Sequence, residues 1–312
     1  MSRLMALARS PWTTRLLLLA AAALGAWVLV RERHAAGAAI QQLSGRDLLL
    51  AFAAGLGLVA CSTMVWRTVL TDLGHRLPVS GAAEIFLLGQ LGKYLPGSVW
   101  PMVMQAEIGR RHHVSRRRTV ATSVITMLIT IAAGTVLIAL TWPLRPDVGG
   151  GTRWLVLLAV PSLTVLHPAV LGRVLDAGLR AVRREPLGSR TTLRGTLVAG
   201  GWAMLEWACA GAMVLALAVP LGLRPGWRSL ALTVGGYALA WLAGLVVIVA
   251  PAGAGAREGA LVALLATVMP TGAGLVVALL ARLMVTSADL VLAGVAALAV
   301  RRAVPAARVP DA

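Results

Sequence analysis

Apolar runs of about 20 residues recur along the whole chain and restrict what it can fold into. Each run is long enough to cross the hydrocarbon core of a bilayer as an α-helix. Such helices are expected at about 14–31, 47–69, 119–142, 154–172, 195–219, 229–250 and 273–300. The sequence therefore predicts an all-α fold, a polytopic integral membrane helix bundle in which residues 1–312 form a single transmembrane domain with about seven or eight crossings.

The composition agrees with that class and argues against nucleic-acid binding. Charged residues make up 13% of the chain, whereas a soluble domain usually has about 25%. The net charge of +17 comes from arginines at the ends of apolar runs, and basic patches interleaved with aromatic residues are absent. This is the positive-inside pattern of a multi-pass cell-membrane protein. It places the basic clusters at 110–118 and 173–194, and with them the N-terminus, in the cytoplasm.

The segment 81–109 is too broken to be a simple span, and it carries the only lysine of the chain, Lys93. We expect a short helix over Ala82 to Leu91, a break at Pro96-Gly97, and another short helix over Val99 to Gly109. Broken backbone is tolerated at membrane depth only where protein or a water-filled cavity satisfies its polar groups. The segment is therefore predicted to be a re-entrant hairpin that lines a polar site, with an ordinary cytoplasmic loop as the alternative.

A second broken and charged element follows at about 251–271. The sequence does not decide whether this element crosses the membrane or is re-entrant. If it crosses, the basic C-terminus is cytoplasmic. If it is re-entrant, the C-terminus lies outside, against the positive-inside rule. Broken segments in corresponding positions of two halves point to a transport site. We therefore expect the two elements to meet near the bilayer centre.

Both broken segments match the pattern of a known family. The run Lys93-Tyr94-Leu95-Pro96-Gly97-Ser98-Val99-Trp100 resembles the first signature of the flippase-like membrane family that includes the transmembrane region of lysylphosphatidylglycerol synthases. The run Pro251-Ala252-Gly253-Ala254-Gly255-Ala256-Arg257-Glu258-Gly259 resembles its second signature, with Ala252 and Ala254 in place of the usual Gly and Leu. The resemblance covers about 45–300 and implies translocation of a lipid between leaflets.

Cationic side chains of the two signatures are the candidate ligands of a lipid phosphate. Lys93 and Arg257 are expected to hold it together, and Glu258 or Glu206 is expected to balance their charge when the site is empty. Glu206 lies well inside the helix expected at 195–219, where a carboxylate must face the bundle interior or carry a proton.

Further candidates accompany these groups. Arg282 lies seven residues before Asp289 and shares its helical face, either as part of an inward polar stripe or as a structural ion pair. Glu107 and Glu84 flank the first break, where either pairs with Lys93 or Arg257 or faces the cytoplasm. The rest are aromatic residues that line a headgroup path or anchor at the interface, and residues that shape the backbone: Tyr94, Trp100, Pro96, Gly97, Gly253 and Gly255.

The expected function is that of a lipid translocase that moves an anionic or sugar-phosphate lipid between leaflets. The alternative is a non-transporting membrane subunit that scaffolds a separate glycosyltransferase or lipid-modifying enzyme. A membrane-embedded transferase with Glu206 or Glu258 as its base would need a nucleophile–base–metal set, which is not visible, so no enzymatic activity, cofactor or metal is expected. The expected partner is a membrane lipid and not a nucleic acid. No GxxxxGK[ST] loop for ATP occurs, so transport would draw on a gradient, the proton motive force or a partner.

Overall fold

The computed structural model describes residues 40–95, 99–144, 157, 159–181, 191–246, 253 and 255–303. Its elements are α4 (Gly45–Asp72), α5 (Val79–Ala83), η1 (Glu84–Leu88), η2 (Leu91–Tyr94), α6 (Trp100–Arg111), α7 (Arg116–Thr141), η3 (Trp142–Leu144), α8 (Ala159–Val165), α9 (Pro168–Ala181), α10 (Leu193–Ala218), α11 (Trp227–Val246), α12 (Ala256–Leu265) and α13 (Thr271–Ala303). No strand occurs within these ranges, and the all-α prediction is confirmed. The helix expected at about 14–31 lies outside the described residues.

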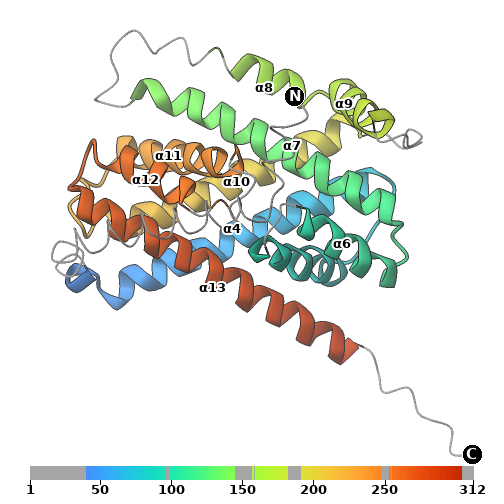
Figure 1. Ribbon diagram of the computed structural model, residues 1–312, viewed down its shortest axis with the longest axis horizontal. Helices are drawn as coiled ribbons and strands as arrows, with labels where there is room; N and C mark the ends of the chain where they lie inside the picture. Colours follow the sequence, from blue (N-terminus) through green and yellow to red (C-terminus); the bar gives the residue numbers. More distant parts are fainter. Residues whose placement is uncertain are drawn as a thin grey trace, which may run out of the picture.

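Among the described residues, five helices are long and apolar enough to cross a membrane: α4, α7 together with η3, α10, α11 and α13 as far as Ala299. They coincide to within a few residues with five of the expected helices. In Figure 1, α4, α10 and α11 lie between α7 on one side and α13 on the other. The polytopic helix bundle is thereby confirmed.

The pairing of α4 with α10 forms the centre of the bundle. α4 begins at a capping box in which the Ser44 hydroxyl accepts a hydrogen bond from the Asp47 N–H (3.3 Å) and the Asp47 carboxylate accepts one from the Ser44 N–H (3.0 Å). At the other end of α4, Asp72 accepts hydrogen bonds from both the N–H and the hydroxyl of Thr192, each 2.6 Å long. The Thr192 hydroxyl in turn caps the Gly195 N–H (3.0 Å). The end of α4 is thus fixed to the start of α10, and the two helices run antiparallel.

Small and aromatic side chains fill the space between the central helices. Ala199 and Ala210 of α10 are fully buried, which lets the neighbouring backbones approach closely. The indole N–H of Trp207 donates a hydrogen bond to the Thr130 carbonyl of α7 (3.1 Å). Its ring meets Trp241 of α11 edge to face, with ring centroids 5.5 Å apart. Trp207 therefore connects three helices next to the cavity described below.

The first broken segment folds as expected into two short helical arms around a break. One arm comprises α5, a π-helical turn (η1) and a 3-10 turn (η2), and the other arm is α6. The arms touch backbone to backbone, because a Cβ placed on Gly92 would lie only 2.8 Å from the Trp100 carbonyl carbon. A glycine at position 92 is therefore required for the arms to close.

The second broken segment leads into α12, which is the short helix expected there. α12 packs between α11 and α13, and Figure 1 shows it in this position. α13 begins immediately after Pro270 and crosses the whole bundle. It contacts α12 as well as η1 and η2, so one helix touches both broken segments.

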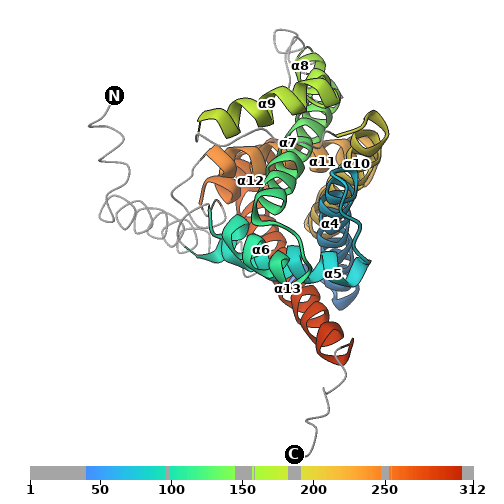
Figure 2. The same ribbon diagram turned by 90° about the vertical axis from the view of Figure 1, so that its right-hand side faces the viewer.

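One expected helix is wrong. Where a single kinked span was expected at 154–172, the structure has two shorter helices, α8 and α9, separated at Leu166 and His167. Pro168 explains the interruption, because its ring disfavours helical backbone at His167 and it has no N–H to continue the ladder. At about 1.5 Å per residue, the described residues of neither helix reach across the roughly 30 Å of a hydrocarbon core. In Figure 2 both helices lie along the outer side of α7.

Candidate functional site

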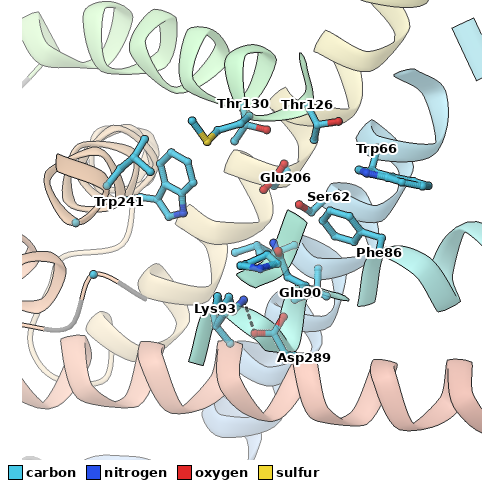
Figure 3. Close-up of a pocket in the computed structure, with 18 of the residues that line it drawn as sticks. Ser62, Trp66, Phe86, Gln90, Lys93, Thr126, Thr130, Glu206, Trp241 and Asp289 are labelled. Atoms are coloured by element: carbon cyan, nitrogen blue, oxygen red, sulfur yellow. Dashed lines mark ion pairs between the residues drawn. The ribbon is translucent and has the colours of Figure 1, made fainter. Parts of the chain in front are cut away.

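A cavity of about 300 Å³ lies inside the helix bundle, and both broken segments contribute to its wall. We call it the central cavity. Its charged wall residues are Lys93, Glu206, Arg257, Arg282 and Asp289, and both tyrosines of the chain also line it. Figure 3 shows Lys93 and Asp289 close to α13, with Glu206 and Ser62 further into the cavity and Thr126 and Thr130 on α7.

The lysine of the first broken segment faces this cavity and is held by a carboxylate. Lys93 Nζ lies 2.6 Å from Asp289 Oδ2, and the side chains are 25% and 3% exposed. The same oxygen accepts a hydrogen bond from the Tyr94 hydroxyl (2.6 Å). Two consecutive residues of η2 therefore converge on one buried oxygen of α13, which fixes the position of the ammonium group in the wall.

The arginine of the second broken segment is held differently. Arg257 donates a hydrogen bond to the Tyr237 hydroxyl of α11, and its guanidinium carbon lies 4.6 Å from the centre of the Tyr237 ring. Gly253 lets the segment approach α11, since it has a φ of +68° and a Cβ there would lie 2.8 Å from the Gly244 Cα. Within the described ranges, no carboxylate lies at ion-pair distance from Arg257.

Glu258 links the start of α12 to α13. One carboxylate oxygen accepts a hydrogen bond from the Gly255 N–H (2.6 Å), a contact that caps the helix and agrees with its dipole. The other oxygen forms an ion pair with Arg282 of α13. Glu258 therefore neutralises Arg282, not Arg257, and of the two paired residues only Arg282 lines the cavity.

Glu206 is the buried acid of the cavity. It comes from the middle of α10, is 8% exposed, and its Oε2 has no hydrogen-bond partner among the described residues. The Ser62 hydroxyl of α4 lies beside the carboxyl group in the cavity. As expected from the sequence, the side chain faces the bundle interior.

Some cavity residues were not foreseen as ligands or partners. Asp289 was expected in an inward polar stripe or in a structural ion pair, and Lys93 was not foreseen as its partner. Tyr237 was not singled out, although tyrosine occurs only twice in the chain and its other copy adjoins Lys93. Gln105 and Ser123 also line the cavity and hydrogen-bond to each other, and Trp66 donates to Ser123 (3.3 Å). Their signal in the sequence is a polar residue inside an otherwise apolar run.

Other candidates lie away from the central cavity. Trp100 is 43% exposed at the start of α6, and Gly255 caps α12 with a φ of +86°. Glu107 is exposed and pairs with Arg116 (2.6 Å) and Arg110 (3.3 Å). The hydrogen bond from Arg116 contributes most to holding the pKa of the Glu107 carboxyl below its ordinary value.

Three further candidates of the first broken segment are Pro96, Gly97 and Glu84. Pro96 and Gly97 lie outside the described residues. Glu84 is buried and pairs with His112 (2.6 Å) at the outer end of the first arm, not with Lys93 or Arg257.

This arrangement is suited to holding a charged group inside a membrane. Three cations from three elements surround one space, and two of them are already neutralised by carboxylates. Lys93 offers a compact charge with rotatable donors, and the guanidinium groups offer planar pairs of N–H donors that fit phosphate oxygens.

A bundle of membrane-spanning helices around a charged internal cavity defines a multi-pass membrane protein with a polar site inside the bundle. The chain belongs to the family described as the lysylphosphatidylglycerol synthase TM region, whose model matches residues 14–294. This family indicates a membrane protein of lipid metabolism or transport. No curated protein matches the chain.

Proposed function

We propose that this protein moves an anionic or sugar-phosphate lipid between the leaflets of the cell membrane. The observation that carries the proposal is the position of Lys93, Arg257 and Arg282 on the wall of one cavity between membrane helices. Ionisable groups at this depth are costly and typically mark substrate pathways. Membership of a family linked to lipid metabolism or transport supports the same conclusion.

The lipid phosphate would enter by exchange of partners. Arg257 has no carboxylate partner in the described part of the chain, so it is the first cation available to an anion. Lys93 becomes available when the phosphate displaces the Asp289 carboxylate from its ammonium group. Each charge-assisted contact contributes roughly 1.5–3 kcal/mol. The headgroup would then lie in the polar cavity while the acyl chains stay in hydrocarbon.

The test is headgroup accessibility in proteoliposomes that contain the full chain. Fluorescent phosphatidylglycerol, aminoacylated phosphatidylglycerol and a polyprenyl-phosphate sugar are supplied in turn, and the fraction quenched from outside is followed over time. We expect the wild type to equilibrate one of these lipids, and Lys93→Ala and Arg257→Ala to do so roughly ten- to a hundred-fold more slowly. Arg224→Ala, which removes an exposed arginine between α10 and α11, is the matched control and should behave like the wild type.

Two outcomes would count against the proposal. If the two cavity variants fold normally and move lipid as fast as the wild type, the cavity is not the headgroup site. If the wild type moves none of the three lipids, the alternative of a scaffold for a separate lipid-modifying enzyme replaces transport.

A further inference from the structure

Glu206 has the properties of a proton-binding group. It is more than nine-tenths buried, lies on a membrane-spanning helix, lines the central cavity, and leaves Oε2 without a hydrogen-bond partner among the described residues. An ionised carboxylate without a partner is very unfavourable in such surroundings, and the group takes up a proton instead. Its connection to the cavity gives that proton a route to water.

The described ionisable groups around Glu206 come from several of the elements that surround the cavity. Those on the cavity wall are Lys93 and Tyr94 of η2, Tyr237 of α11, Arg257 of α12, and Arg282 and Asp289 of α13. Two thiols adjoin these positions along the chain: Cys61 precedes Ser62 in α4, and Cys209 follows Glu206 by three residues in α10. From α7, the described polar side chains on the wall are hydroxyls, including Thr126 and Thr130. Among these groups the cations are Lys93, Arg257 and Arg282.

The net charge of these groups depends on whether Glu206 carries a proton. Among the described residues of the site, three cations, Lys93, Arg257 and Arg282, are accompanied by two paired carboxylates, Asp289 and Glu258. One positive charge remains while Glu206 is neutral, and none remains once Glu206 is ionised. A phosphodiester headgroup carries one negative charge. The occupied site is therefore neutral only when Glu206 is protonated, and a net charge inside a membrane is costly.

We propose that Glu206 binds one proton together with each anionic headgroup, so that lipid transport is coupled to proton movement. This inference rests on the function proposed above and adds an energy source for the lipid transport. Glu206 takes the proton from water on the side where the lipid enters, and returns it to water on the side where the lipid leaves. The proton and the anion cross together, and the transported pair carries no net charge.

Lys93 provides the physical link between the two ligands. Lys93 and Glu206 line the same cavity, where a positive charge opposes protonation of a carboxyl group, and a phosphate bound to Lys93 cancels that effect. Anion binding therefore strengthens proton binding. By linkage, a proton on Glu206 must strengthen anion binding by the same factor.

The test measures how phosphatidylglycerol binding depends on pH. The purified full chain is titrated in an uncharged detergent, and binding is followed by the fluorescence of the tryptophans, of which Trp66, Trp207 and Trp241 line the cavity. The wild-type affinity is expected to fall about tenfold per pH unit on the alkaline side, as one coupled proton requires. Glu206→Gln, which mimics the protonated acid, should bind with an affinity independent of pH. Asp176→Asn, which removes an acid of α9 outside the cavity, should keep the wild-type slope.

A second measurement needs no variant. In weakly buffered solution, binding of phosphatidylglycerol to the wild type at alkaline pH should raise the pH of the solution by the uptake of one proton per lipid. A wild type that binds with pH-independent affinity and takes up no proton overturns the coupling but leaves the proposed transport standing. A folded Glu206→Gln protein whose lipid affinity depends on pH as in the wild type would also overturn the coupling and leave the proposed transport standing. A wild type that neither binds nor moves lipid at any pH overturns both proposals.

Discussion

Arg282 and Asp289 lie seven residues apart on one face of α13, and each forms an ion pair with a different broken segment of the chain. Asp289 pairs with Lys93 of η2, and Arg282 pairs with Glu258 of α12. Two helical turns separate the two residues by about 10 Å along the axis. α13 therefore holds both segments against the same cavity, and a displacement of this helix would act on both at once.

Removal of the Asp289 charge should destabilise the empty protein. Asp289→Asn leaves the Lys93 ammonium without its counterion in a largely buried position, a change expected to lower the free energy of unfolding by about 3 kcal/mol. Thermal unfolding in detergent measures this effect. Added phosphatidylglycerol should restore part of the stability, because its phosphate supplies the missing negative charge.

The matching control removes both charges. In Lys93→Met/Asp289→Asn, no unpaired charge remains, so most of the lost stability should return. A double variant as unstable as Asp289→Asn alone would show that Asp289 stabilises the fold through contacts other than its ion pair with Lys93.

Glu258 should show two separable contributions to stability. Glu258→Gln keeps an oxygen that can accept from the Gly255 N–H but loses the charge opposite Arg282. Glu258→Ala loses both, and should be about 0.5–2 kcal/mol less stable than the Gln variant, which is the usual contribution of a helix cap. Thermal unfolding of the two proteins side by side gives the difference. Equal stabilities would mean that the cap contributes nothing.

The long helices could be predicted because hydropathy summed over about 20 residues averages out local detail. The helices expected at 47–69 and 195–219 agree with α4 and α10 for this reason. The same averaging predicted one span over 154–172, kinked at Pro161 and Pro168, because a proline hardly changes the mean hydropathy of a window. In the structure the backbone before Pro168 interrupts the helix completely, through local geometry that a window does not measure.

The sequence was enough to predict which cations line the cavity, but not which carboxylate pairs with each of them. A lone lysine at a helix break indicated a polar site, and Lys93 does line one. The counterion was expected to be Glu258 or Glu206, whereas the structure has Asp289, which lies 195 residues after Tyr94 in the sequence and bonds to it as well. Which carboxylate meets which cation depends on how each helix is rotated and how deep it lies, and periodicity within one helix does not fix either.

Closure of the first broken segment should depend on Gly92. In Gly92→Ala, the new methyl group would overlap the start of α6 at Trp100 and Pro101, so we expect a loss of about 1–3 kcal/mol and a displaced Lys93. Gly259→Ala is the control, since a Cβ there meets nothing within 4 Å and alanine favours the helical backbone of α12. Thermal unfolding and lipid movement are measured for both. A Gly92→Ala protein with wild-type stability and transport would contradict the close approach of the two arms.

Tyr237 should act as a positioning residue for Arg257. Tyr237→Phe removes the hydroxyl that accepts the Arg257 hydrogen bond and keeps the ring under the guanidinium group. Without this hydrogen bond the guanidinium group is less well oriented, and the binding free energy of phosphatidylglycerol should weaken by about 1.5 kcal/mol, which is roughly a tenfold loss of affinity. A double-mutant cycle separates this role from general packing: in an Arg257→Ala background, Tyr237→Phe should have no further effect on affinity. An equal loss of affinity in both backgrounds would show that the hydroxyl of this buried residue acts on the site by a route that does not involve Arg257.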